Sequence, residues 1–193
     1  MTMIHLASSS PRRAELLRQI GVEFAVLKVE VDESIYPGEP AEDYVLRIAR
    51  NKAGAGAAMR ASESAEFRVL GADTTIVLDG DIMGKPADRA DCRCMLERLS
   101  GRRHQVLTAV ALATPAGIEQ RLSRSEVSFR SLSMAEIEAY CAGTEPMDKA
   151  GGYAIQGRAA VFIERLEGSY SGVMGLPLFE TAELLKASGL KLV

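Results

Sequence analysis

Two arginines stand at the expected start of a helix, where cations are normally unfavourable. Arg12-Arg13 follow the segment Ser8-Ser9-Ser10-Pro11. A serine at position 10 suits the N-cap and a proline suits the first helical position. The helix dipole makes each cation in the first turn cost about 0.3–1 kcal/mol. Free N–H groups at a helix start bind phosphate, and arginine grips it with two hydrogen bonds, so this context favours a phosphate site over two solvated arginines.

Two lysines are further candidates for contact with an anion. Lys52 lies at helical spacing from Val45 and Ile48, on the apolar face of a predicted helix. There its amine either reaches solvent, which is the commoner case, or meets a buried anion. Lys85 lies between a glycine and a proline, which would aim its ammonium with little freedom. A lysine in a surface turn explains that position more simply.

Carboxylates interrupt or close two apolar strands. Asp73 divides the apolar run 69–78, and a carboxylate there is costly unless it is paired, hydrogen-bonded or bound to a metal. We favour a functional interpretation over a capped bend, because ligand clefts in α/β proteins form at strand ends. Asp32-Glu33 closes the strand expected at 24–31. Such a pair suits Mg²⁺, which takes one or two carboxylates plus phosphate oxygens, although a solvated turn explains it equally well.

A glycine-rich stretch, residues 148–157, is a candidate for binding a flat ligand. Its sequence is DKAGGYAIQG, and it contains Gln156, whose side-chain amide can both donate hydrogen bonds to a base edge and accept them from it. Glycine at 71 allows another backbone to approach the strand around Asp73. The alternative for 148–157 is a long connecting loop, but glycine-rich loops are often functional.

The elements that would position these residues mix helices and strands throughout. The order is not a regular βαβ alternation, which indicates an α/β domain with a mixed sheet. We expect strands at 4–6, 24–31, 68–78, 105–113, 118–129 and 160–166, and helices beginning near 11, 41, 87, 133 and 177.

Composition excludes several classes of protein. With 193 residues, the chain can form one domain, or two small lobes that share a core. A hydrophobic fraction of 47% makes disorder a poor interpretation. Short apolar runs and the lack of a secretory signal predict a cytoplasmic protein without a membrane span. The net charge of −3 argues against nucleic acid as a partner. The odd count of 3 Cys predicts reduced thiols, with Cys92 in the core.

The inventory of candidates points to one kind of chemistry. It comprises two arginines, two lysines and three acids, and it lacks an activated nucleophile. Cations would neutralise phosphate charge, while carboxylates would hold a divalent metal and deprotonate water. This predicts metal-assisted attack of water on a polyphosphate. A regulator that only binds nucleotides could use the same groups.

At these residues the chain resembles the Maf family of nucleoside triphosphate pyrophosphatases. The resemblance covers nearly the whole chain, with several short motifs in the family's order. They are LASSSPRR at 6–13, VDE at 31–33, ARNKA at 49–53, GADT at 71–74, GKP at 84–86, DKAGGY with QG at 148–157, and VMGLP at 173–177.

The resemblance implies a long mixed sheet with two α/β lobes and a cleft between them, as in the inosine triphosphate pyrophosphatase superfamily. Residues 1–193 would then form a single Maf-like domain. It also implies hydrolysis between the α- and β-phosphates with Mg²⁺ or Mn²⁺, and a possible homodimer. The role would be house-cleaning of the nucleotide pool; a regulator of cell division or a pyrophosphatase for a modified nucleotide are the alternatives.

The resemblance also implies roles for particular residues. Asp73 matches the proton acceptor, and Glu33 matches a metal or catalytic carboxylate, so these two would hold the metal. A phosphate-side set comprises Ser8, Arg12, Lys52 and Lys85, of which the two lysines complete the catalytic group. Three positions that set base preference are Arg13, Thr74 and Gln156. That combination is similar to the branch acting on dTTP and UTP rather than to the branch that prefers 7-methyl-GTP. Thr75 departs from the aliphatic residue common there, without touching these roles.

Overall fold

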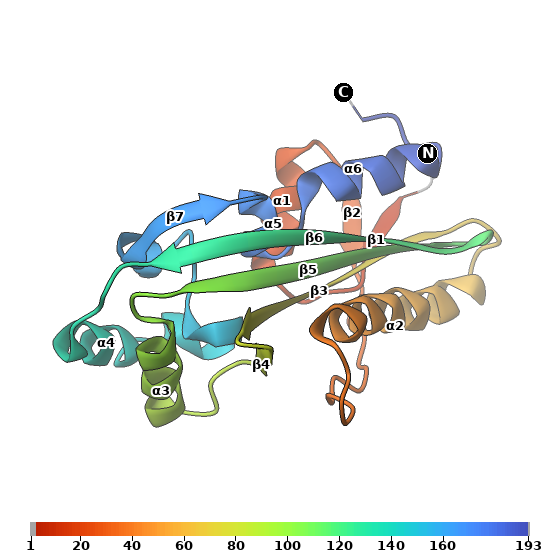
Figure 1. Cartoon of the computed structure of the whole chain (residues 1–193). Coiled ribbons are helices and arrows are strands. Elements are labelled where there is room, and N and C mark those ends of the chain that lie inside the picture. Colours follow the sequence, from red (N-terminus) through yellow and green to blue (C-terminus); the bar gives the residue numbers. More distant parts are fainter. Residues whose placement is uncertain (1–2, 193) are drawn as a thin grey trace.

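A long hairpin organises the sheet of this computed structural model, which describes residues 3–192 (Figure 1). Within that part of the chain, seven strands form one sheet in the order β2-β1-β3-β5-β6-β7, with β4 pairing β3. β1 is parallel to both its neighbours, and the other pairs are antiparallel, so the predicted mixed α/β class is confirmed. The strands are β1 (Ile4–Leu6), β2 (Phe24–Val26), β3 (Arg68–Leu78), β4 (Asp81–Met83), β5 (Arg103–Thr114), β6 (Gly117–Phe129) and β7 (Ile163–Glu167).

Helices cover both faces of the sheet at one end and close it at the other. The long helix α2 lies along one face, α1, α5 and α6 lie on the opposite side, and α3 and α4 gather at the far end of the hairpin (Figure 1). The helices are α1 (Pro11–Gln19), α2 (Ala41–Ala61), α3 (Arg89–Leu99), α4 (Met134–Cys141), α5 (Tyr170–Met174) and α6 (Leu178–Ala187). In 3–192, none combines the length and apolar character needed to cross a membrane.

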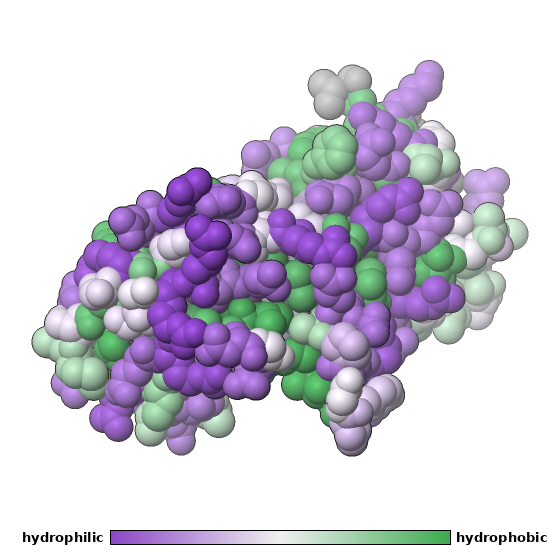
Figure 2. Space-filling view, in the orientation of Figure 1, coloured by the Kyte–Doolittle hydropathy of each residue, from purple (hydrophilic) through white to green (hydrophobic). Residues whose placement is uncertain are grey.

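Alternation along β3 divides the core between these helices. Leu70 packs in a cluster with residues of α1 and α6, whereas Val69 packs in a cluster with α2. The outer hairpin strand β6 also alternates in exposure, and hydrophilic side chains form a band along this face in Figure 2. Arg103 of β5 forms an ion pair with Glu126 of β6, with Nη1 2.7 Å from Oε2. A third cluster, around Leu96 and Phe129, fills the space between α3, α4 and the sheet.

Helix α2 approaches β3 unusually closely at Gly71. A Cβ atom there would lie 2.5 Å from the backbone oxygen of Ala49 and 2.6 Å from the backbone nitrogen of Ala53. The buried face of α2 consists largely of small residues at this level. The close backbone approach predicted at Gly71 is therefore confirmed, and it sets how near α2 comes to the strand that carries Asp73.

We predict that Gly71→Ala lowers the free energy of unfolding by about 1–3 kcal/mol, because the new methyl group overlaps backbone that cannot move aside easily. The matched control is Gly54→Ala, in the same helix that Gly71 contacts. A Cβ at Gly54 meets only Ile118 Cδ1, at 3.5 Å, so this change raises stability by about 0.5–1 kcal/mol. Urea unfolding of both variants measures the difference. Equal effects of the two changes would contradict the close contact.

A buried histidine anchors the glycine-rich stretch to the hairpin. His104 Nε2 lies 2.7 Å from the Tyr153 hydroxyl, and both rings stand edge-on to Phe129. Only 2% of His104 is exposed. Burial lowers the pKa of His104 to about 4, so this side chain is neutral in the folded protein near neutral pH.

This burial predicts a loss of stability in mild acid. The unfolded chain takes up the histidine proton near pH 6.5 but the folded chain only near pH 4. Folding stability therefore falls as the pH decreases through that window. Between pH 7 and 4.5 the free energy of unfolding of the wild-type protein should fall by roughly 2–3 kcal/mol more than that of His104→Gln, whose side chain at this position cannot titrate. Urea unfolding at both pH values tests this, and equal losses in the two proteins would refute it.

Two strand predictions were partly wrong. The strand expected at 24–31 ends at Val26, because its pairing partner β1 stops at Leu6. The last hydrogen bond between the two segments runs from the Leu27 N–H to Leu6 O at 2.9 Å. The strand expected at 160–166 starts late, since Arg158–Phe162 forms a 3₁₀ turn before β7. Ala159 and Phe162 are both buried there, a spacing of three residues that suits the 3₁₀ period. The sequence analysis also missed the short helix α5.

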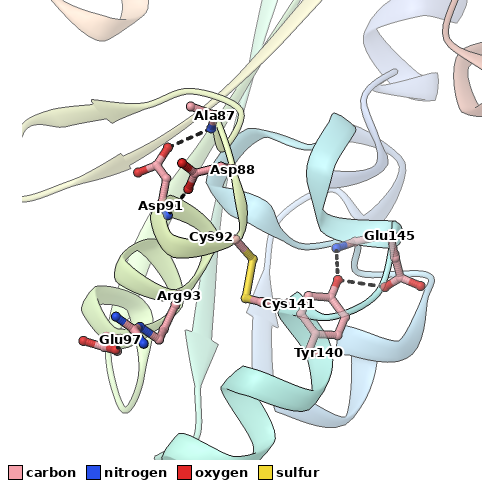
Figure 3. The surroundings of a disulfide bond; sticks show 10 residues. Ala87, Asp88, Asp91, Cys92, Arg93, Glu97, Tyr140, Cys141 and Glu145 are labelled. Atoms are coloured by element: carbon pink, nitrogen blue, oxygen red, sulfur yellow. Dashed lines mark hydrogen bonds and ion pairs between the residues drawn. A yellow bond between two sulfur atoms is a disulfide. The ribbon is translucent and has the colours of Figure 1, made fainter.

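The prediction of reduced thiols was wrong for two of the cysteines. Cys92 on α3 and Cys141 on α4 form a disulfide that joins these two helices (Figure 3). The two cysteines are 49 residues apart in the sequence. They can pair because the hairpin brings α3 beside α4, and their spacing in the sequence does not reveal this. Cys92 is fully buried, so its core assignment is confirmed. Cys94, on the other side of α3, is free and exposed.

Candidate active site

The side chains selected from the sequence surround one cavity of about 480 Å³. They come from six separated parts of the chain and are listed here in sequence order: Ser8, Arg12, Arg13, Glu33, Lys52, Asp73, Thr74, Lys85 and Gln156. Asp32, the other acid of the pair, instead accepts a hydrogen bond from the Ser34 N–H at 2.9 Å. Asp32 therefore closes a turn, and of the two acids only Glu33 reaches the cavity.

The cavity opens at a gap along one edge of β3. On the edge opposite β5, β1 pairs with residues 68–70 and β4 pairs with residues 76–78. Residues 71–75 thus lack a strand neighbour on that edge in the described chain. Asp73 and Thr74 point to opposite faces of the sheet but both border the gap. The gap lets one ligand contact residues from both faces.

Lys52 joins the two carboxylates of the site. Its Nζ lies 2.8 Å from Asp73 Oδ1 and 2.8 Å from Glu33 Oε1. The side chains of Lys52 and Asp73 are only 13% and 10% exposed. Of the two interpretations of Lys52, contact with a buried anion is therefore correct. Burial opposes ionisation of Glu33, but the hydrogen bond and charge of Lys52, with Lys85 and Arg13, outweigh it and lower the pKa of Glu33.

Arg13 is fixed in place by three protein oxygens. Its Nε donates to Gly175 O at 2.8 Å, and its two terminal nitrogens donate to Ser8 Oγ at 3.1 Å and Thr74 Oγ1 at 3.4 Å. Burial lowers the pKa of Arg13, and the negative charge of Asp73 opposes that shift. Ser10 occupies the N-cap, but its side chain makes no capping bond. Instead, the Ser8 hydroxyl accepts the Ser10 N–H at 3.2 Å as well as the hydrogen bond from Arg13.

A buried threonine that the sequence analysis missed supports this arrangement. The Thr108 hydroxyl donates to Gly172 O at 2.7 Å and lies 3.1 Å from Thr74 Oγ1. Because its one hydrogen goes to the carbonyl, Thr74 donates to Thr108 and accepts from Arg13. A lone threonine inside the apolar run of β5 was the available signal, but threonine is common in strands and so gives a weak one.

The opposite wall of the cavity comes from the glycine-rich stretch and the turn that carries Lys85. The Gly151 N–H donates to Gly84 O at 2.9 Å, which ties the two together. Behind them, the Tyr140 hydroxyl donates to Glu145 at 2.8 Å and accepts the Ala154 N–H at 3.3 Å (Figure 3). Lys85 and Gln156 are exposed at the rim of the cavity.

One ion pair crosses from this wall to α1. Arg12 Nη1 lies 3.4 Å from Asp148 Oδ2, and Lys149 also contacts Asp148. Asp148 and Lys149 line the cavity. The sequence analysis included both in the candidate stretch 148–157 but gave neither an individual role. Burial opposes ionisation of Asp148, but Lys149 and then Arg12 outweigh it and lower the pKa of Asp148.

Comparison with known proteins decides the family. The model of the family described as Maf-like protein matches residues 3–188. This chain belongs to the Maf family. The resemblance stated from the sequence motifs is thereby confirmed.

Relatives within the Maf family match over almost their whole length. A protein of Aromatoleum aromaticum named dTTP/UTP pyrophosphatase is 55% identical over 96% of this chain and 95% of its own. Proteins of the same name from Methylobacillus flagellatus and Cupriavidus metallidurans are 53% and 51% identical, over 98% of this chain and 94% and 98% of theirs. A nucleoside-triphosphatase / dITP/XTP pyrophosphatase crystal structure from Mycobacterium abscessus shows a weaker likeness: 22% identity, 68% and 76% coverage, TM-score 0.43.

The donor set suits a metal that arrives with a phosphate ligand. In 3–192, no group of three or more His, Cys, Asp or Glu side chains could hold a metal ion. Glu33 and Asp73 do supply two carboxylates close enough to share the Lys52 ammonium. Mg²⁺ and Mn²⁺ favour oxygen ligands, and Mg²⁺ commonly takes one or two carboxylates plus substrate phosphates. The residues therefore fit such an ion.

Proposed function

We propose that this Maf protein hydrolyses dTTP and UTP to the nucleoside monophosphate and pyrophosphate. The observation that carries the proposal is the ammonium of Lys52 bound to two carboxylates in a cavity that Arg12 and Lys85 also line. Cations and acids so arranged can bind a triphosphate and activate water in the same place. The names of the relatives supply the substrate.

The phosphates, in this proposal, lie among the cations. Ser8, Arg12 and Lys85 bind phosphate oxygens, and Lys52 shares its charge between phosphate and the acids. A divalent cation held by Glu33 and Asp73 neutralises phosphate charge when it is bound. Asp73 accepts the proton of the attacking water, which adds to the α-phosphorus as pyrophosphate leaves. The low exposure of Asp73 and Lys52 limits the access of bulk water to their charged groups, so that these groups interact with the bound ligand instead.

Base selection falls, in this proposal, to Arg13, Thr74 and Gln156. Gln156 can complement a pyrimidine edge that alternates acceptor, donor and acceptor at O2, N3–H and O4. Arg13 and Thr74 bond to each other, so we expect them to act as a pair. A site built on such hydrogen bonds discriminates against a base that leaves buried groups unpaired.

We further propose that residues 1–193 work as one domain whose two lobes share the sheet, and that the protein acts in the cytoplasm, where its substrates are. A homodimer stays a prediction from the family resemblance.

The first test is the product and its dependence on Asp73. With dTTP and Mg²⁺ the protein should release pyrophosphate, so phosphate becomes detectable only after inorganic pyrophosphatase is added. Asp73→Asn should lower kcat by about 10²–10⁴-fold while dTTP still binds, because the base is lost but the cations remain. Asp81→Asn, which alters an exposed ion pair with Arg98 outside the cavity, is the control.

Direct release of phosphate would refute the α–β cleavage, and full activity in Asp73→Asn would remove Asp73 as the base. A protein that binds dTTP tightly but releases neither product would instead support the regulatory alternative. A screen of purine and modified triphosphates in the same assay tests the third possibility.

The second test is base preference. Gln156→Glu should lower the ratio of kcat/KM for dTTP over CTP by about tenfold or more, since a carboxylate cannot donate to O4 or O2. This ratio is measured for the wild-type protein and for the variant with the pyrophosphate assay at a fixed metal concentration. An unchanged ratio would remove Gln156 from base recognition.

A further inference from the structure

Glu33 stands in a segment without helix or strand. Residues 27–40 connect β2 to α2, and the part that carries the acid, residues 32–40, is called the acid loop here. The Glu33 side chain is 48% exposed, against 10% for its neighbour Asp73 on β3. Asp73 is positioned by a central strand, so something else must hold Glu33 beside it.

Arg47, in the second turn of α2, contacts three residues of the acid loop. Its guanidinium forks onto Glu39, with Nε 2.6 Å from Oε1 and Nη2 2.6 Å from Oε2. The same Nη2 donates to Ser34 O at 2.9 Å. The Tyr36 ring lies over the guanidinium, 3.9 Å from its carbon to the ring centroid.

These contacts converge on the backbone beside Glu33. Ser34, whose carbonyl Arg47 holds, is the next residue, and the Glu33 carbonyl itself accepts from the Tyr44 hydroxyl at 3.2 Å. Lys52 then binds the carboxylate. All three supports belong to α2, the helix that Gly71 brings close to Asp73. Burial, then the charges of Asp73 and Glu33, raises the pKa of Tyr44 to about 12, so its hydroxyl keeps its proton.

The Arg47 contacts are more than an exposed ion pair. Side-chain exposure is 19% for Arg47 and 9% for Glu39, and a planar fork that also stacks on a ring fixes the geometry at both partners. A lysine would keep the charge but could not reach both Glu39 oxygens and the Ser34 carbonyl at once.

We propose that Arg47 is a positioning residue for the reaction: through Glu39 and Ser34 it holds the acid loop so that the Glu33 carboxylate lies beside Lys52 and Asp73. This inference rests on the proposed function of the cavity. Arg47 touches none of the reacting groups in it, and its effect passes through Glu33.

The test compares two bidentate arginine–glutamate salt bridges in the same protein. Arg47→Lys should lower kcat/KM for dTTP by about 10- to 100-fold, the size expected for a misplaced catalytic group. Arg124→Lys is the control, because Arg124 forks onto Glu42 at the start of α2 with the same 2.6 Å distances. Neither Arg124 nor Glu42 lines the cavity, so activity should stay within about twofold. Glu39→Gln, which weakens the same fork from the other side, should reproduce the Arg47→Lys loss.

A double-mutant cycle separates positioning from general destabilisation. In the Glu33→Gln background, Arg47→Lys should have no further effect on kcat/KM beyond about twofold, because the group it positions is already gone. Hydrogen exchange of residues 32–40 should increase in Arg47→Lys and not in Arg124→Lys. Unchanged exchange of the loop, or an equal loss of activity with and without Glu33, would overturn the proposal.

The exchange measurement also keeps this inference distinct from the proposed function. A wild-type protein that hydrolyses no triphosphate would defeat the proposed function alone. Exchange of the acid loop in the two arginine variants would then decide whether Arg47 positions Glu33.

Discussion

One ammonium group between two carboxylates is the interaction on which the site depends. Lys52 Nζ lies 2.8 Å from oxygens of both Asp73 and Glu33. Lys52 and Asp73 are largely buried, and a buried charge without a partner is strongly destabilising. These two therefore require one another, Glu33 joins them from a half-exposed position, and the elements that carry the three must meet. α2 has to approach β3 closely, which Gly71 permits, and the loop before α2 has to return to the same place, which Arg47 secures.

The open stretch of β3 gives this charged group access to a ligand. Were β1 or β4 longer, a neighbouring strand would cover residues 71–75 on that edge. Instead the sheet is interrupted where its charged residues lie. Arg13 and Thr74 approach from the α1 and α5 side, and Lys52 and Glu33 from the α2 side. The glycine-rich wall and the turn of Lys85, held by the pair of His104 and Tyr153, close the far side.

Sequence reasoning succeeded where a residue contradicted its surroundings. Asp73 in an apolar strand, Lys52 on an apolar helix face and glycine at 71 are local contradictions, and each is resolved by a contact in the structure. The family resemblance added Thr74 and gave the candidate residues their separate roles. Reasoning failed where the outcome depended on distant partners. The strand from Phe24 stops early because β1 does.

The other misses have the same cause. Cys92 and Cys141 pair because the hairpin brings two helices together, and nothing in their spacing announces it. Thr108 and Arg47 look ordinary in a strand and in an amphipathic helix. Their importance lies in which hydroxyl or carbonyl stands opposite, and only the three-dimensional arrangement shows that.

The most direct measurement is a crystal structure with Mn²⁺ and α,β-imido-dUTP, a nucleotide that cannot be cleaved at the α–β bridge, with the metal located by its anomalous scattering. The predicted result is a triphosphate among Arg12, Lys52 and Lys85, and manganese on an oxygen of Asp73 or Glu33. A triphosphate bound outside this cavity, or manganese on neither carboxylate, would contradict the shared site.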